Sequence, residues 1–303
     1  MTLRQSASSM CLAASAGALI IFSSWVNAAD DAGQAQQSSS RSTAGDSSWS
    51  LRLPQENKVS FRGVVSFDEA GAGNTQLLYP APNAVGFLAA VLTHGAVVES
   101  QKKKQKDQIQ EAADKVLSPY ETVLSHYTHK ELMQRGLQKV SAGGMHKLIE
   151  FSKIPDSKWL VVSAPVFLIT QDQSAIILEN SIAIHAPDTP SNVLYQNTIR
   201  VVSETKEGKD LTGFWTANQG EKLKEESAGL FAQSLDIAMS EMANGSNSGD
   251  KPQKTFRYLE GHTEKMERGQ LISEQCNRMV IKTLRGGLIS IPARRDGNSG
   301  LRC

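Results

Sequence analysis

The chain has 303 residues, of which 40% are hydrophobic and 6% aromatic, and its formal net charge at pH 7 is +1. The apolar content is sufficient for the core of one large domain or two small ones. The balanced charge gives no reason to expect tight binding of a polyanion by the whole surface, and we expect no nucleic-acid partner. The low aromatic content also argues against a carbohydrate-binding surface built of stacked rings.

Residues 1–28 have the layout of a secretory signal peptide. A single basic residue, Arg4, precedes an apolar stretch from Cys11 to Val26, and a small residue, Ala28, stands where a signal peptidase would cut. An uncleaved membrane anchor is one alternative, although a stretch of about 16 residues is short for a span. A lipoprotein is another, although Cys11 begins the apolar stretch instead of following it. We therefore expect a periplasmic or secreted protein, cleaved near Ala28.

The two cysteines that remain after cleavage, Cys276 and Cys303, suit an oxidising compartment. A disulfide between them would tie down the C-terminal tail, whereas the alternative is two free thiols. Their wide separation and the lack of a histidine nearby in the sequence do not resemble a zinc site. We therefore predict a disulfide and no bound metal.

Residues 29–55 are rich in Ser, Gln, Gly, Ala and Asp, a composition that predicts a disordered spacer. An α+β domain is expected over 56–244. Within it, Ala84–Val98 is apolar on all sides, which predicts a helix that is buried in the core, inserted in a membrane or paired with a second copy. With the basic run that follows, Ala84–Lys106 could contact an anionic membrane surface. The alternative for the basic run is a solvated helix face.

An amphipathic stripe extends this helix to about residue 117. Two capping signals follow, one at Ser118 and one at Thr128, each with a glutamate three residues later. They predict two short helices, over 119–127 and 129–139.

Three apolar runs over 159–170, 175–185 and 193–203 predict strands, and their short connections favour an antiparallel meander. Pro165 should confine the first of these strands to a sheet edge or interrupt it. The elements expected after the meander are a loop, a helix and a linker, over 208–220, 221–242 and 245–252.

The last expected unit, over 253–303, is small, basic and built of strands around a hairpin turn at 285–287. Alternate side chains of a strand share a face, so Arg278 and Lys282 should point the same way. Neighbouring strands could add further basic side chains to a patch that suits the phosphates of an envelope polymer. The residues predicted to bind this anionic ligand are Arg257, Arg268, Arg278, Lys282 and Arg285. The alternative is that they pair with glutamates of the same unit.

The sequence carries no G-x-S-x-G motif and no glycine-rich phosphate loop, so it designates no catalytic residue and no cofactor. His126 and His129 are three residues apart, but the cap predicted at Thr128 separates them, which favours surface histidines over metal ligands.

These patterns predict an α+β fold: a mainly antiparallel sheet with long packed helices, followed by a small C-terminal β unit. The predicted function is an exported bacterial envelope protein of a non-enzymatic binding or assembly type. Its partner would be an envelope protein, an anionic polymer, a membrane surface or a second copy. The alternative function is a periplasmic hydrolase whose site is assembled from residues scattered along the chain.

Overall fold

The computed structural model describes residues 48–65, 100–186, 192–244, 251–275 and 277–293. The predicted signal segment, the cysteine pair and the apolar segment Ala84–Val98 lie outside the described residues, so these expectations stay predictions. The described residues from Ser48 onward belong to one compact unit.

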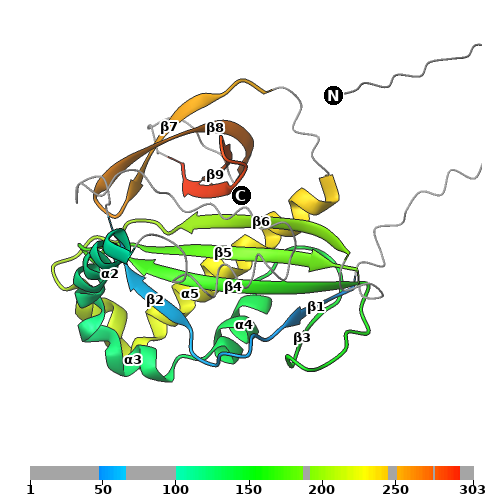
Figure 1. Cartoon of the computed structure of the whole chain (residues 1–303), viewed down its shortest axis with the longest axis horizontal. Coiled ribbons are helices and arrows are strands. Elements are labelled where there is room, and N and C mark those ends of the chain that lie inside the picture. Colours follow the sequence, from blue (N-terminus) through cyan, green and yellow to red (C-terminus); the bar gives the residue numbers. More distant parts are fainter. Residues whose placement is uncertain (1–47, 66–99, 187–191, 245–250, 276, 294–303) are drawn as a thin grey trace, which may run out of the picture. The chain divides into compact units, whose positions relative to one another are not determined.

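The core of this unit is a single mixed sheet of ten strands (Figure 1). Its strands, in spatial order, are β3 (His146–Ile149), β1 (Trp49–Arg52), β4 (Trp159–Ile169), β5 (Ile176–His185), β6 (Val193–Val202), β10 (Leu288–Pro292), β9 (Arg278–Thr283), β8 (Thr263–Gln275) and β7 (Lys254–Glu260), while β2 (Ser60–Gly63) pairs with β4. The pairs β1–β3, β1–β4, β2–β4 and β6–β10 are parallel.

The predicted fold class is therefore wrong in two respects. The sheet is mixed, because segments distant in the sequence insert beside the antiparallel meander. In addition, α5 (Leu211–Asn244) is the one long helix among the described residues. The others are the short helices α2 (Ser100–Asp114), α3 (Glu121–His126) and α4 (His129–Leu137), with a 3-10 segment, η1 (Lys115–Tyr120), between the first two.

The helix start predicted at Ser118 is wrong, because Ser118 lies inside η1 and α3 begins after Tyr120 without a side-chain cap. Pro119 lies inside η1, where the α-helical hydrogen bonding of α2 has already stopped. The Thr128 hydroxyl accepts a hydrogen bond from the backbone N–H of Glu131 at 3.1 Å, which begins α4. The predicted N-cap at Thr128 is thereby confirmed.

Strand β1 lies inside the segment predicted as a disordered spacer, so that prediction is wrong for Trp49–Arg52. Trp49 and Leu51 are almost fully buried. They fill the core between β3 and β4, and the Trp49 ring stacks on His146 at 5.1 Å. A four-residue strand after a polar stretch has too few alternating positions to be recognised from the sequence.

The meander β4–β5–β6 is antiparallel, as predicted. Pro165, however, lies within an internal strand. The pairing of β1 with β4 ends at Val161 and that of β2 with β4 begins at Val166. Pro165 therefore occupies the gap in which β4 changes its partner, so its missing N–H leaves no ladder bond unmade on that side.

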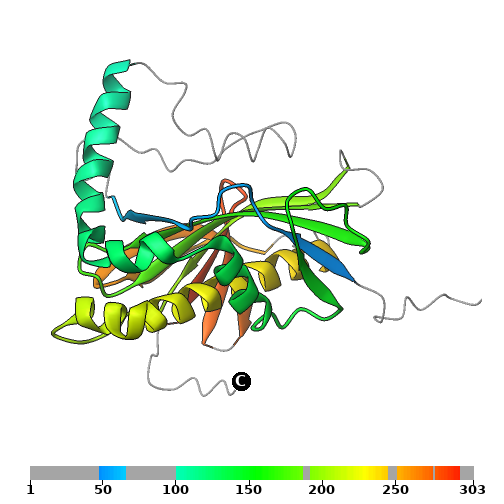
Figure 2. The same cartoon turned by 90° about the horizontal axis from the view of Figure 1, so that it is seen from below.

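The sheet has a hydrophobic core on each face. On one face, α5 packs over β5 and β6 and α4 packs against β3 (Figure 2). On the other face, β7, β9 and β10 contribute Tyr258, Ile281 and Ile291 to a second cluster, which includes Ile177 of β5 and Val202 of β6. The C-terminal strands thus continue the main sheet and curl over the face that the helices leave open.

Among the described residues, no helix is both long and apolar enough to span a bilayer.

Candidate functional site

Three of the predicted anion-binding residues share one face of the C-terminal strands. In the β7–β8 ladder, Arg257 lies opposite Met266, and Thr255 lies opposite Arg268. The same alternation continues to Gln270, which lies opposite Lys282 of β9. We call the face formed by Arg257, Leu259, Glu264, Met266, Arg268 and Lys282 the outer hairpin face.

This outer hairpin face is open to solvent and combines cationic with apolar side chains. Met266 is 63% exposed and Leu259 is 39% exposed. Arg257 has one ion pair, to Glu264 at 3.5 Å, in which both side chains are largely exposed. Within the part of the chain that the structure describes, Arg268 and Lys282 form no ion pair or side-chain hydrogen bond. Both cations are therefore available to an anionic ligand.

Arg278 does not belong to this surface, which corrects its predicted role. Its guanidinium turns into the sheet and donates to the Val202 carbonyl at 2.6 Å and to the Ser290 carbonyl at 3.1 Å. Burial lowers its pKa from 12.5 to about 10, while Glu204 and Glu226 act to raise it. The strand alternation placed Arg278 on the same side as Lys282, but its guanidinium is held by carbonyl groups of β6 and β10.

Arg285, the fifth predicted residue, lies in the exposed turn between β9 and β10. Its charge acts on Glu267, whose pKa is raised by burial and partly lowered again by Arg285. The structure therefore places Arg285 beside a carboxylate.

A second cluster of titratable side chains joins three turns that are far apart in the sequence. His262, at the tip of the β7–β8 hairpin, contacts Asp172 of the β4–β5 turn through Nδ1 at 2.8 Å. Its Nε2 lies 3.3 Å from a carboxylate oxygen of Glu207, which follows β6. The hydrogen bond with Asp172, followed by the one with Glu207, raises the pKa of His262.

Asp172 is the best-connected member of this cluster. It accepts hydrogen bonds from the Thr170 hydroxyl at 2.5 Å and from the backbone N–H groups of Ser174 and His262. Burial acts to raise its pKa, but these hydrogen bonds outweigh burial, so the pKa of Asp172 lies below its usual range. The lowered pKa of Asp172 and the raised pKa of His262 both favour an ionised aspartate beside a protonated histidine.

The backbone nearby is strained. Gln173, Asn218 and Gln219 have φ angles of 60°, 53° and 60°, and Gly220 follows with 77°. The last three residues form a left-handed turn that divides α5 into a short first part and a long second part. Such conformations persist only where surrounding contacts hold them. Here the Gln173 side chain accepts from Tyr120 and Thr212, and its carbonyl accepts from Trp215.

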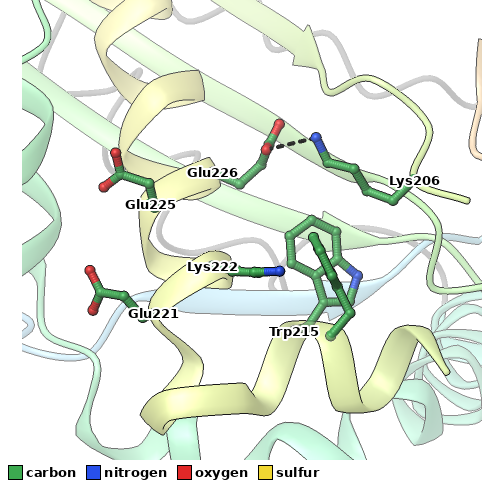
Figure 3. A pocket seen from close by; sticks show the side chains of 7 residues that line it. Lys206, Trp215, Glu221, Lys222, Glu225 and Glu226 are labelled. Carbon is green, nitrogen blue, oxygen red and sulfur yellow. Dashed lines mark ion pairs between the residues drawn. The ribbon is translucent and has the colours of Figure 1, made fainter. Parts of the chain in front are cut away.

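This left-handed turn shapes a cleft of about 240 Å³ between the two parts of α5 (Figure 3). Trp215 forms its floor, and the Lys222 ammonium lies 4.0 Å from the centre of the Phe214 ring. Lys206 and Glu226 form an ion pair of 3.1 Å across one side, which Figure 3 marks with a dashed line. Lys206 and Glu226 thus neutralise each other, whereas the Lys222 ammonium contacts an aromatic ring.

Two further acidic residues at the rim of the cleft point away from Trp215 in Figure 3. Glu221 pairs with Arg135 at 2.5 Å, and Glu225 pairs with Lys139. These ion pairs join α5 to α4 and to the residues just after it, so both glutamates hold these segments together.

The two histidines predicted to lie at the surface have different environments. His126 is exposed and contacts the Thr122 carbonyl at 2.8 Å, whereas His129 is buried at 5% exposure, contrary to that prediction. Burial lowers the pKa of His129 from 6.5 to about 4. The sequence pattern missed this because His129 begins α4 where the chain before β2 covers it: its N–H donates to the Asn57 carbonyl.

Within the described ranges, no three His, Cys, Asp or Glu side chains are arranged to hold a metal ion. No hydroxyl or thiol among the described residues hydrogen-bonds His262 either. Asp172, Glu207 and His262 were not recognisable from the sequence as a group, because each lies in a different polar turn.

Comparisons with family models, with curated proteins and with solved structures found no match for this chain.

Proposed function

We propose that this chain is an exported, non-enzymatic binding or assembly protein of the bacterial cell envelope. We propose further that its outer hairpin face contacts phosphate groups of an anionic envelope polymer or membrane surface. The observation that carries this proposal is the presence of the exposed Arg257 and Arg268 and the half-buried Lys282 on one sheet face, around the exposed Met266.

The charge arrangement supports contact with an anion rather than internal stabilisation. The pair between Arg257 and Glu264 is long and exposed, and such pairs contribute little to folding. Arg268 and Lys282 lack an ion-pair partner within the described part of the chain. Guanidinium groups bind phosphate oxygens in a bidentate manner, and Met266 and Leu259 could contact acyl chains beside the phosphates.

The test is a sedimentation assay with the chain that begins at Ala29. Vesicles that contain phosphatidylglycerol represent a membrane surface, lipopolysaccharide represents an envelope polymer, and phosphatidylcholine vesicles are the neutral reference. The double variant Arg257→Gln with Arg268→Gln should bind the anionic probes roughly 30-fold more weakly, at about 1 kcal/mol per basic side chain. Added salt should weaken the binding of the unaltered chain.

Lys130→Gln with Lys153→Gln is the matched control, because it removes the same charge from exposed sites elsewhere. An equal loss of binding in this control would show that binding depends only on the net charge of the protein. That result would overturn the assignment to the outer hairpin face. Absence of binding to both anionic probes by the unaltered chain would overturn the ligand class.

The second candidate is a hydrolase, and the observation in its favour is the cluster of Asp172, His262 and Glu207. A carboxylate on Nδ1 of a histidine is the arrangement that orients a general base. Nε2, however, faces Glu207, and a histidine held between two carboxylates favours the protonated form, which cannot accept a proton. Turnover of an ester or peptide library that disappears in His262→Gln would favour this candidate over binding.

A further inference from the structure

Strand β3 forms one end of the ten-stranded sheet and, within the residues that the structure describes, pairs only with β1. Its hydrogen-bond directions follow from the parallel ladder. The Met145 and Ile149 carbonyls accept from the N–H groups of Trp49 and Leu53. In a parallel ladder the residues of one parity bond to one neighbour, so Lys147 and Ile149 face β1, and His146 and Leu148 direct their N–H and C=O groups outward.

The ends of this edge carry large apolar side chains in solvent. Met145 is 80% exposed, Phe151 is 48% exposed and Ile154 is 84% exposed. Three of the seven large apolar side chains that are exposed in the described part of the chain thus lie within ten residues, around one open strand. An open edge with exposed apolar residues is a template for pairing with another strand.

We propose that β3 is a self-association surface, at which β3 of a second copy pairs antiparallel across a two-fold axis at Leu148. A two-fold axis perpendicular to the sheet continues each face of the sheet into the same face of the second copy. It also places the residue on the axis opposite its own copy. Leu148 is the suitable centre, because its N–H and C=O both point outward and can bond to the same groups of the second Leu148.

This register brings together the exposed apolar side chains at the two ends of β3. Met145 precedes β3 and Phe151 follows it, so antiparallel pairing places Met145 of one copy near Phe151 of the other. The pair next to the centre is Lys147 with Ile149 of the other copy. Each of these pairs occurs twice because of the symmetry.

The opposite end of the sheet is formed by β7, which carries Arg257 of the outer hairpin face. Self-association at β3 would therefore leave the outer hairpin face free for the anionic partner, and the two proposals stand independently.

The experiment measures the mass of the chain that begins at Ala29 by sedimentation velocity over a concentration series. The unaltered chain should approach the mass of a dimer, and Met145→Lys with Phe151→Lys should remain monomeric at every concentration. Leu194→Lys with Leu284→Lys, which alters two exposed apolar side chains elsewhere, should dimerise normally. Circular dichroism verifies that all variants are folded.

A monomeric unaltered chain would overturn the proposal, as would a dimer that the changes at Met145 and Phe151 leave intact. A dimer that dissociates instead in Leu88→Asp would assign association to the apolar segment Ala84–Val98 and also overturn it. The register has its own readout: a photoreactive benzoylphenylalanine at position 151 should cross-link to the region of Met145 in an isotopically distinct copy.

Discussion

Arg200 of β6 and Glu260 at the end of β7 are joined by two hydrogen bonds, from Nε at 3.1 Å and from Nη2 at 2.8 Å, although sixty residues separate them. Glu260 is 5% exposed and also accepts from the Tyr258 hydroxyl. Burial acts to lower the pKa of Arg200, but Glu260 and Glu179 outweigh it and raise that pKa. This contact fastens the curled C-terminal strands to the centre of the sheet.

Glu260→Gln should lower the free energy of unfolding by about 2–4 kcal/mol, because it leaves part of the buried Arg200 charge uncompensated. Urea denaturation measures the change. Glu264→Gln is the control on the same hairpin, where the ion pair with Arg257 is exposed and its loss should cost under about 0.5 kcal/mol. Equal effects of the two changes would show that the Arg200 contact does not hold the hairpin.

The contact between His262 and Asp172 should make the hairpin tip sensitive to pH. The folded pKa of His262 is raised above 6.5, so the stabilisation is complete below that value and is lost as the pH rises through the folded pKa. NMR titration should show that Asp172→Asn lowers the pKa of His262, and amide exchange in β7 should become faster at high pH. A titration curve of His262 that Asp172→Asn leaves unchanged would contradict this.

His129 should make the protein less stable in acid. Its folded pKa is about 4 against 6.5 unfolded, so the neutral form is required, and stability falls as the pH decreases from 6.5 towards 4. The loss should reach about 3 kcal/mol. His129→Leu should reduce this slope in unfolding measured across the interval, while His126→Gln, at an exposed site, should keep it. A slope that persists in His129→Leu would locate the acid sensitivity elsewhere.

The left-handed turn in α5 should depend on glycine. A Cβ on Gly220 would lie 2.3 Å from a Val123 methyl at a φ of 77°, so Gly220→Ala should destabilise the protein by about 2 kcal/mol or more. Gly229 lies in the second part of the same helix and has open space around it. Gly229→Ala should therefore stabilise by about 0.5–1 kcal/mol. Thermal unfolding of both variants tests the pair, and a tolerated Gly220→Ala would mean that the turn can relax.

Local signals predicted several elements well. The caps at Thr128, the antiparallel meander and the hairpin turn at 285–287 depend on residues close in the sequence, and the structure confirms them. Gly286 has a left-handed conformation with a φ of 87°, and the pair Gly286-Gly287 in the sequence predicts such a turn.

The candidate site was harder to predict from the sequence than these elements. The pattern placed Arg257, Arg268 and Lys282 on strands, and the observed register does put them on one face. It could not separate Arg278 from them, because strand alternation assigns a side but not its burial. Nor could it assemble Asp172, Glu207 and His262, whose proximity depends on how far the sheet curls.

By itself, the sequence determined several local elements, namely the N-cap of α4, the antiparallel meander and the turn between β9 and β10, because capping and turn chemistry act over a few residues. It missed β1 and the start of α5, which begins at Leu211 inside the predicted loop over 208–220. Only the tertiary structure decided which strands are neighbours. The parallel insertion of β1 beside β4 and of β10 beside β6 buries apolar surface contributed by segments more than 80 residues apart. That burial, and the closure by Arg200 and Glu260, are non-local energies that no short window of the chain contains.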